Sequence, residues 1–207
     1  MTVTLRGTSS RFYSIFIAVA AGILLIAGMI HGGIHELIWT LPATLFMLAL
    51  AWVMFWNPRL VIGPGGLHVI NLFREHHIPW ADFSYAENRW GLYLYSRSHR
   101  KISVWAVPSN VGLFSNSWRD RKKQRKDPTS LTWADSGAEH RYCDVPFAAD
   151  LITMRAQQIA RHSSLRRELS AQLDTPWPTQ TTARWQIIPL ALLGVTLAVL
   201  VWRLAAI

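Results

Sequence analysis

The densest group of charged side chains in this chain is a run of cations at residues 119–126. It holds six cations and one anion in eight residues, a net charge of six minus one, or +5. Each cation near an anionic membrane surface contributes about 1 kcal/mol, so the run could supply roughly 5 kcal/mol. We therefore predict contact with anionic lipid headgroups through Arg119, Arg121, Lys122, Lys123, Arg125 and Lys126.

Two alternatives to lipid remain for this run. It could be a solvated loop without a dedicated partner, or it could neutralise the phosphates of a nucleic acid while flanking aromatic rings stack on bases. Nucleic acid is disfavoured because the cations lie in one loop rather than across a sheet. The aromatic residues of the neighbouring strands are also expected in a core. We expect no nucleic acid among the partners.

Histidine pairs could bind metal ions where their spacing suits coordination. His31 and His35 are four residues apart, but the two glycines between them interrupt a helix, and two ligands are too few. His76 and His77 are neighbours on a predicted strand, so their side chains point to opposite faces. The sequence therefore predicts no metal site.

No residue pattern predicts catalysis. Cys143 is the single cysteine, and we expect it to be a small buried hydrophobic residue. The glycine-rich turn at residues 63–66 leads into a predicted strand, whereas a phosphate-binding loop must open a helix. The sequence contains no nucleophile elbow and no dinucleotide fingerprint. We expect a protein that is not an enzyme and binds no cofactor.

Three long uncharged runs determine where this site would lie. Residues 12–30, 37–56 and 185–202 hold 19, 20 and 18 residues without a charge. As helices they would each span roughly 27–30 Å, which matches the hydrocarbon thickness of a bilayer. We predict three membrane-spanning helices. A cleaved signal peptide, the alternative for the first run, is disfavoured because that run is long and a second one follows closely.

Charge asymmetry predicts the orientation of these spans. Residues 57–184 carry 18 of the 21 Lys and Arg residues and 11 of the 12 acidic ones, a net charge of +7, whereas residues 31–36 contain no Lys or Arg. Cations stay preferentially on the cytoplasmic side. We therefore expect a multi-pass protein of the plasma (inner) membrane. Its N-terminus and middle domain would be cytoplasmic, and its C-terminus would lie outside.

Residues within and beside the spans have predicted roles in anchoring and packing. Tryptophans gather at membrane interfaces, and small residues four apart allow helices to approach closely. The predicted interface anchors are Trp39, Trp56, Trp185 and Trp202, and the predicted packing residues are Ala18 with Gly22 and Gly194 with Ala198.

The middle of the chain is predicted to be an α+β domain. Short β-type stretches lie at 59–62, 67–71, 74–80, 83–86, 90–95 and 101–107, with a further pair at 131–134 and 141–145. An amphipathic helix follows at 147–173. Short strands at this spacing predict a bent antiparallel barrel or sandwich capped by that helix. The expected parts are a hairpin of spans (1–56), a cytoplasmic domain (57–174) with a basic insertion (109–130), a proline-rich linker (175–184) and a third span (185–204).

The middle domain resembles the bacterial pleckstrin-homology (PH)-like membrane proteins typical of actinobacteria. The resemblance lies in Asn57-Pro-Arg-Leu, Gly65-Gly-Leu-His-Val, Ile78-Pro-Trp, Arg89-Trp-Gly-Leu-Tyr-Leu and Arg100-Lys-Ile-Ser-Val-Trp-Ala-Val-Pro. It implies a PH-like fold between membrane spans. It does not extend to specific inositol-phosphate recognition, because the turn at residues 63–66 contains no cation.

These expectations combine into a docking function. The PH-like domain would act as a docking or scaffold module at the inner leaflet and would contact anionic lipid, a protein partner, or both. The alternative is an accessory or assembly subunit of a larger membrane complex, in which the faces bearing the small residues make the main contacts. A membrane-tethered nucleic-acid binder or an enzyme of unknown type is the third choice.

Overall fold

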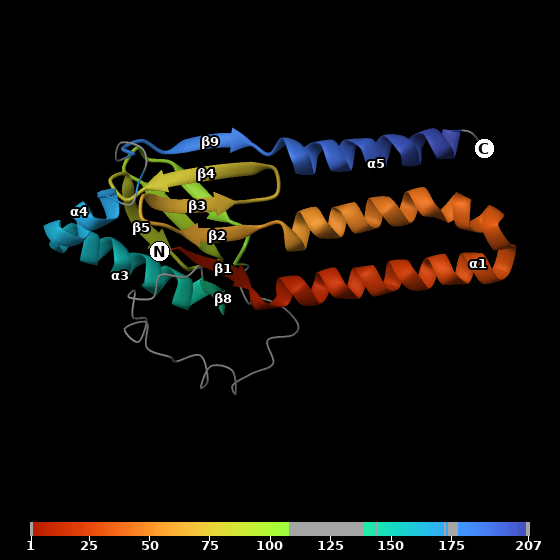
Figure 1. Cartoon of the computed structure of the whole chain (residues 1–207), viewed down its shortest axis with the longest axis horizontal. Helices are drawn as coiled ribbons and strands as arrows, with labels where there is room; N and C mark the ends of the chain where they lie inside the picture. Colours follow the sequence, from red (N-terminus) through yellow and green to blue (C-terminus); the bar gives the residue numbers. More distant parts are fainter. Residues whose placement is uncertain (1, 108–138, 144, 172, 174–177, 206–207) are drawn as a thin grey trace, which may run out of the picture. The chain divides into compact units, whose positions relative to one another are not determined.

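A computed structural model describes residues 2–107, 139–143, 145–171, 173 and 178–205 and divides the chain into two compact units (Figure 1). The first, which we call the sheet unit, comprises Met1–Gly7, Arg59–Asn71 and Glu75–Arg184. The second, the helix unit, comprises Thr8–Pro58, Leu72–Arg74 and Trp185–Ile207. Each unit therefore combines segments that are distant in the sequence.

Among the described residues the strands form two sheets. They are β1 (Val3–Gly7), β2 (Arg59–Ile62), β3 (Gly66–Ile70), β4 (Arg74–Pro79), β5 (Phe83–Glu87), β6 (Leu92–Ser96), β7 (Lys101–Val104), β8 (Glu139–Cys143) and β9 (Thr182–Trp185). One sheet has the order β8-β1-β2-β3-β4-β9 and the other the order β5-β6-β7. Strands β1 to β4 pair antiparallel in succession, as do β5 to β7, while β8 pairs with β1 in parallel.

Most of the predicted strands are present, with two additions and one change of partner. The stretches predicted between residues 59 and 107 correspond to β2 through β7. Residues 3–7 and 182–185 form strands, although we expected them in a helical hairpin and in a linker with a span. Strand β8 pairs with β1 in parallel, and residues 131–134, its expected partner, lie outside the described residues. The prediction of an entirely antiparallel sheet was wrong at this pair.

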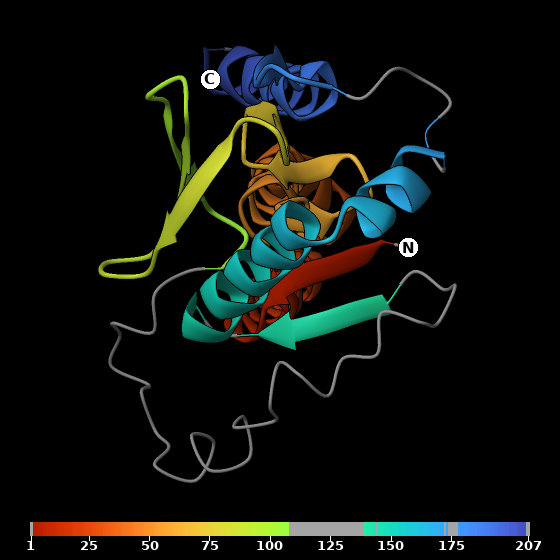
Figure 2. The ribbon, with the colours of Figure 1, turned by 90° about the vertical axis from the view of Figure 1, so that its left-hand side faces the viewer.

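Alternation along the strands builds the core of the sheet unit. Leu60, Ile62, Leu67, Val69 and Ile78 are all buried. Because successive strand residues point to opposite faces, the residues between them lie on the outer face of the sheet. Two helices, α3 (Val145–Arg161) and α4 (Ser163–Ala171), follow the strands, and α3 contacts β5 and β6 (Figure 2).

The predicted helix at 147–173 is divided at His162, which is not helical. Ser163 and Ser164 follow the break, and serine side chains compete for backbone hydrogen bonds and so favour helix starts over helix interiors. The buried face of the first part includes Leu151, Ile152 and Ile159, as the amphipathic pattern indicated.

The β2–β3 turn requires glycine at its last position. Gly66 has a φ of +155°, and a Cβ added there would lie 2.3 Å from the Ile78 carbonyl oxygen. The backbone of β4 therefore passes directly against this residue. A hairpin, rather than a phosphate-binding loop, is confirmed at residues 63–66.

A buried carboxylate forms hydrogen bonds that connect the residue before β9 to the rest of the sheet unit. Asp82 is 8% exposed and accepts hydrogen bonds from the backbone N–H and the hydroxyl of both Ser98 and Thr181. Burial alone would raise the pKa of Asp82, but these four hydrogen bonds outweigh it and lower the pKa below its ordinary value. The ionised form of Asp82 therefore joins residues 99 positions apart.

The helix unit contains two apolar helices rather than the three that we expected. Helix α1 (Thr8–Ala51) continues into the π-helical turn η1 (Trp52–Trp56), and the second apolar helix is α5 (Ile187–Ala205). Helix α1 covers both predicted N-terminal spans, which meet at a kink at Gly33, whose φ of 65° and ψ of −147° are not helical. The expected six-residue loop is thus reduced to a kink at one glycine (Figure 1).

The two halves of α1 lie side by side in the helix unit. The Ser10 hydroxyl donates to the Phe55 carbonyl, and the Ser14 hydroxyl donates to the Ala51 carbonyl at 3.4 Å. Ser14 and Ala21 are buried, and a Cβ added at Gly28 would lie 3.4 Å from the Thr40 hydroxyl. Small residues at seven-residue spacing therefore allow the two halves to approach closely.

Both apolar helices expose most of their surface. In the most apolar 18-residue stretch of Ser10–Trp56, only 11% is buried inside the structure. In the corresponding stretch of Ile187–Ala205, 6% is buried. Ile30 and Ile187 are each 77% exposed. By length and composition, both helices could cross a membrane.

Candidate functional site

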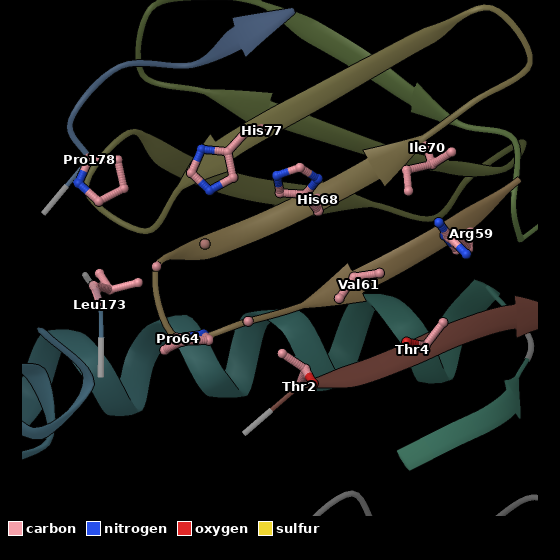
Figure 3. A pocket seen from close by; sticks show the side chains of 13 residues that line it. Thr2, Thr4, Arg59, Val61, Pro64, His68, Ile70, His77, Leu173 and Pro178 are labelled. Carbon is pink, nitrogen blue, oxygen red and sulfur yellow. The ribbon is translucent and has the colours of Figure 1, made fainter. Parts of the chain in front are cut away.

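A cavity of about 560 Å³ lies on the outer face of the six-stranded sheet (Figure 3). Thr2 and Thr4 contribute from the N-terminal strand region, and the glycine-rich turn of residues 63–66 lies at one end. Leu173 and Pro178 approach the same turn, since the Leu173 methyl carbons would lie 3.3 and 3.5 Å from a Cβ at Gly65. The cavity is thus built from backbone, hydroxyl, apolar and imidazole groups of one unit, together with the guanidinium of Arg59.

Cross-strand register brings two imidazoles together in this cavity. Thr4 lies opposite Val61, Val61 opposite His68, and His68 opposite His77. The two imidazole rings are 4.8 Å apart between centroids. His68 Nδ1 lies 2.9 Å from the Glu75 carboxylate. We call Glu75, His68 and His77 the histidine cluster.

The cluster differs from its surroundings in electrostatic character. Burial, and secondarily the neighbouring His68, lowers the pKa of His77 below its ordinary value, while Glu75 opposes this shift. At neutral pH His77 is therefore an uncharged imidazole that can donate and accept one hydrogen bond each. The arrangement can bind a polar group beside the apolar side chains of Val61 and Ile70. Across the described ranges, no group of three or more His, Cys, Asp and Glu residues could hold a metal ion.

Sequence reasoning missed the pairing of His68 with His77. The spacing along the chain relates His77 only to its neighbour His76, whose side chain points to the opposite face. The pairing follows from the β3–β4 register, in which His68 lies opposite His77 and Leu67 opposite Ile78. A register drawn from the predicted hairpin could have found it.

A second group of chemically distinct residues lies at the ends of the apolar helices. The Arg11 guanidinium lies 5.5 Å from the ring centroid of Trp56, and Arg74 lies 4.2 Å from that of Trp185. Both pairs lie in the part of the helix unit where α1 starts, η1 ends and α5 starts. Guanidinium groups over tryptophan faces are attractive contacts of about 0.5–2 kcal/mol.

The kinked part of α1 carries a third such pair. The Arg203 guanidinium lies 3.8 Å from the ring centroid of Trp39, and Trp39 Nε1 also donates to His35 Nε2 at 3.1 Å. Three predicted anchors, Trp39, Trp56 and Trp185, therefore each contact an arginine. The fourth, Trp202, is 69% exposed.

The predicted packing residues lie largely on the surface of their helices. Ala18, Gly194 and Ala198 are exposed, and a Cβ added at Gly22 or Gly194 would find no atom within 4 Å. Packing inside the helix unit uses the face of Ser14 and Ala21 instead. Contact with another protein through these small-residue faces stays a prediction.

Several aromatic residues expected in the core lie on the surface. Leu92 and Leu94 are buried, but Tyr85 is 52% exposed and stacks on Tyr95 with centroids 4.4 Å apart. The Lys101 ammonium lies 4.1 Å from the centroid of a third tyrosine ring, Tyr93. In a two-sided strand only one face can be buried, and here the leucines occupy it. The expectation that these tyrosine rings lie in a core, which was one argument against nucleic-acid binding, was wrong.

The predicted lipid contact at residues 119–126 lies outside the described residues. Cys143 is the last residue of β8 and pairs with Gly7 in the ladder.

Comparison with known proteins gives one match. Residues 57–113 match a family model described as a bacterial PH domain. This region covers β2 through β7, and thus the strands that carry the histidine cluster. Neither the curated proteins nor the solved structures contain a match.

Proposed function

We propose that this chain, whose residues 57–113 match a bacterial PH domain, is an integral membrane protein without enzymatic activity. Its PH-like region would act as a docking module at the inner face of the membrane. Docking of lipids or proteins is the role that PH domains commonly have. The surface of the apolar helices supports the membrane part of this proposal, and the histidine cluster supports the docking part.

The exposure of the apolar helices is the observation that carries the proposal. A core helix of a soluble protein buries its apolar face, whereas these helices leave residues such as Ile187 and Ile188 more than 70% exposed. Exposure of apolar surface to water costs about 25 cal/mol per Å². Hydrocarbon removes that cost, so a bilayer is the environment that fits these helices.

The helix ends support three crossings. Helix α5 has 19 residues and would span roughly 28 Å. On either side of Gly33, α1 has 25 and 18 residues, and the five residues of η1 extend the second half. Arginine–tryptophan pairs lie where interfacial anchors are expected. The excess of cations in residues 57–184 supports a cytoplasmic position for the PH-like region.

The cavity with the histidine cluster is the surface that best supports docking. It offers hydrogen-bonding groups and the guanidinium of Arg59 beside apolar side chains, a combination that fixes the orientation of a bound partner. The basic run at residues 119–126 would add anionic lipid as a second partner.

Membrane integration is tested by extraction and labelling. We expect the chain to stay in the membrane fraction after alkaline carbonate treatment. An impermeant amine label applied to intact cells should miss the lysines of residues 57–184. Release by carbonate, or labelling of Lys101 from outside, would contradict the proposal.

Docking is tested by crosslinking from the cavity. A photo-crosslinking residue in place of Ile70, which lines the cavity, should capture a partner in native membranes, and His68→Ala with His77→Ala should abolish the adduct. The same crosslinker in place of Tyr85, on the other sheet, is the matched control. Equal adducts from both positions, or none from Ile70, would refute docking at the cavity.

The exposed small-residue faces favour one second candidate. An accessory or assembly subunit of a larger complex would use Ala18 with Gly22 and Gly194 with Ala198, and a Cβ added at either glycine would find no atom of the described residues within 4 Å. In that case the helices, rather than the cavity, would make the main protein contacts.

A further inference from the structure

The turn between β3 and β4 belongs to the helix unit rather than to the strands that it connects. Leu72–Arg74 clusters with α1 and α5, whereas the residues before and after it cluster with the sheets. The Gln186 backbone N–H donates to the Phe73 carbonyl at 2.9 Å, and Asn57 Nδ2 donates to Gln186 Oε1 at 2.8 Å. These bonds join the turn to the start of α5 and to the residue after η1.

The composition of this turn is unusual for a hairpin in water. Turn positions favour Gly, Asn, Asp, Ser and Pro, but this turn presents Phe73 with 39% of its surface exposed. Arg74 follows and is exposed, with its guanidinium 4.2 Å from the centroid of Trp185. An exposed aromatic residue next to an arginine–tryptophan pair is the composition of a membrane interface, where rings lie at headgroup level.

We propose that Leu72–Arg74 is a lipid-contacting turn in which Phe73 enters the boundary between headgroups and acyl chains and Arg74 binds a phospholipid phosphate. The inference rests on the proposed function, because it needs α5 to lie in a bilayer. Stacking on Trp185 occupies the face of the guanidinium, while its N–H donors point outward along the edge and can form paired hydrogen bonds to phosphate oxygens. This contact uses residues other than those of the basic run at 119–126.

Fluorescence quenching by lipids tests this turn in the full chain. In a Cys143→Ser background, Phe73→Cys is labelled with an environment-sensitive fluorophore and reconstituted into nanodiscs of phosphatidylcholine with phosphatidylglycerol. Lipids that carry a nitroxide high on the acyl chain should quench this label strongly, and aqueous iodide should quench it weakly. The label should respond less to lipids with a nitroxide near the end of the chain.

Two labelled controls separate the possible failures. Val195→Cys lies in the middle of α5 and is 63% exposed, so a deep nitroxide should quench it, whereas Tyr85→Cys on β5 should respond only to iodide. Quenching by lipid at residue 195 but not at residue 73 overturns the inference alone. Absence of lipid quenching at both residues overturns the proposed membrane integration as well.

Substitution of Arg74 tests the phosphate contact. Arg74→Gln should weaken lipid quenching of the residue-73 label at least twofold, and Arg74→Lys should restore it in part, because the charge remains without the paired donors. Arg97→Gln, an exposed arginine at the β6–β7 turn, is the matched control and should leave the signal unchanged. Equal signals for Arg74→Gln and Arg97→Gln would overturn the role of Arg74.

Discussion

Single residues hold together segments of this chain that are far apart in the sequence. Gly66 allows β4 to pass against the β2–β3 turn, Asp82 connects Thr181 to the turn at Ser98, and Gly33 reverses α1. The two glycines have positive φ angles, and Asp82 is a buried carboxylate with a lowered pKa.

Gly66→Ala should destabilise the sheet unit by roughly 2 kcal/mol or more. The added methyl group would meet backbone atoms of Ile78 and Pro79, and alanine is strained at a φ of +155°. Thermal unfolding of the full chain in detergent measures the loss. Gly63→Ala is the matched control, because its nearest neighbour would be 3.7 Å away. Equal melting temperatures for the two variants would contradict this account.

Asp82→Asn should cost about 1–3 kcal/mol at neutral pH, because it removes a charged acceptor from four hydrogen bonds. The lowered pKa of Asp82 also predicts the pH dependence. Its contribution is present above the unfolded pKa of about 3.9 and is lost as the pH falls through the lower pKa of the folded state. The melting temperatures of the wild type and the variant should therefore differ by a constant amount above about pH 5 and approach each other as the pH falls below about 3.9. A difference that grows as the pH falls would refute the assignment.

At the scale of elements, the two longest apolar helices differ in whether they are continuous. Helix α5 is continuous, whereas α1 contains a single non-helical residue at which its two halves turn back on each other. The basic run is a third kind of element, defined by charge alone.

Gly33→Ala should weaken the hairpin of α1 by about 1–3 kcal/mol, because a φ of 65° with a ψ of −147° is nearly exclusive to glycine. A disulfide between Ser14→Cys and Ala51→Cys, in a Cys143→Ser background, reports whether the halves lie side by side. Gly33→Ala should slow its formation, and Gly22→Ala, where no atom lies within 4 Å, should not. Equal rates in both variants would argue against a requirement for glycine at the kink.

Changing Arg121, Lys122, Lys123 and Lys126 together to Gln should remove the contact of residues 119–126 with anionic lipid. Each cation contributes about 1 kcal/mol, so roughly 4 kcal/mol should be lost. The measurement is the rate at which a protease that cleaves after Lys and Arg cuts the chain at Arg119 and Arg125. This rate is compared between anionic and zwitterionic nanodiscs, and slower cleavage in anionic nanodiscs reports the contact. Wild-type chain cleaved at the same rate in both kinds of nanodisc would end the lipid interpretation.

At the scale of the whole molecule, two kinds of surface are available to partners. The sheet unit offers the cavity with the histidine cluster, and the helix unit offers the small-residue faces. The two proposals for protein partners differ in which surface they use.

If the chain is an accessory subunit, extraction in mild detergent should give a species far larger than one 23.5 kDa chain with its micelle. Gly22→Leu with Gly194→Leu should reduce that size, since close helix approach needs small residues. Ile23→Leu is the control, because it preserves the volume of an exposed apolar residue. A monodisperse monomer from native membranes would contradict the accessory role.

Local sequence was informative wherever structure depends on neighbours along the chain. The strands between residues 59 and 107 and the glycine-rich hairpin follow from alternation and turn residues, which act over a few positions. The roles of Val3–Gly7 and Thr182–Trp185 were missed because a lone strand is stabilised only by the sheet that it joins.

The sequence by itself determined the apolar runs, their lengths and the asymmetry of charge, because these properties depend on composition and not on contacts. Only the tertiary structure decided that β1 lies between β2 and β8, that His68 faces His77 and that Arg74 stacks on Trp185. Each of these contacts depends on strand register or on the meeting of distant segments. Many pairings satisfy the same local patterns, and burial of one common core selects among them.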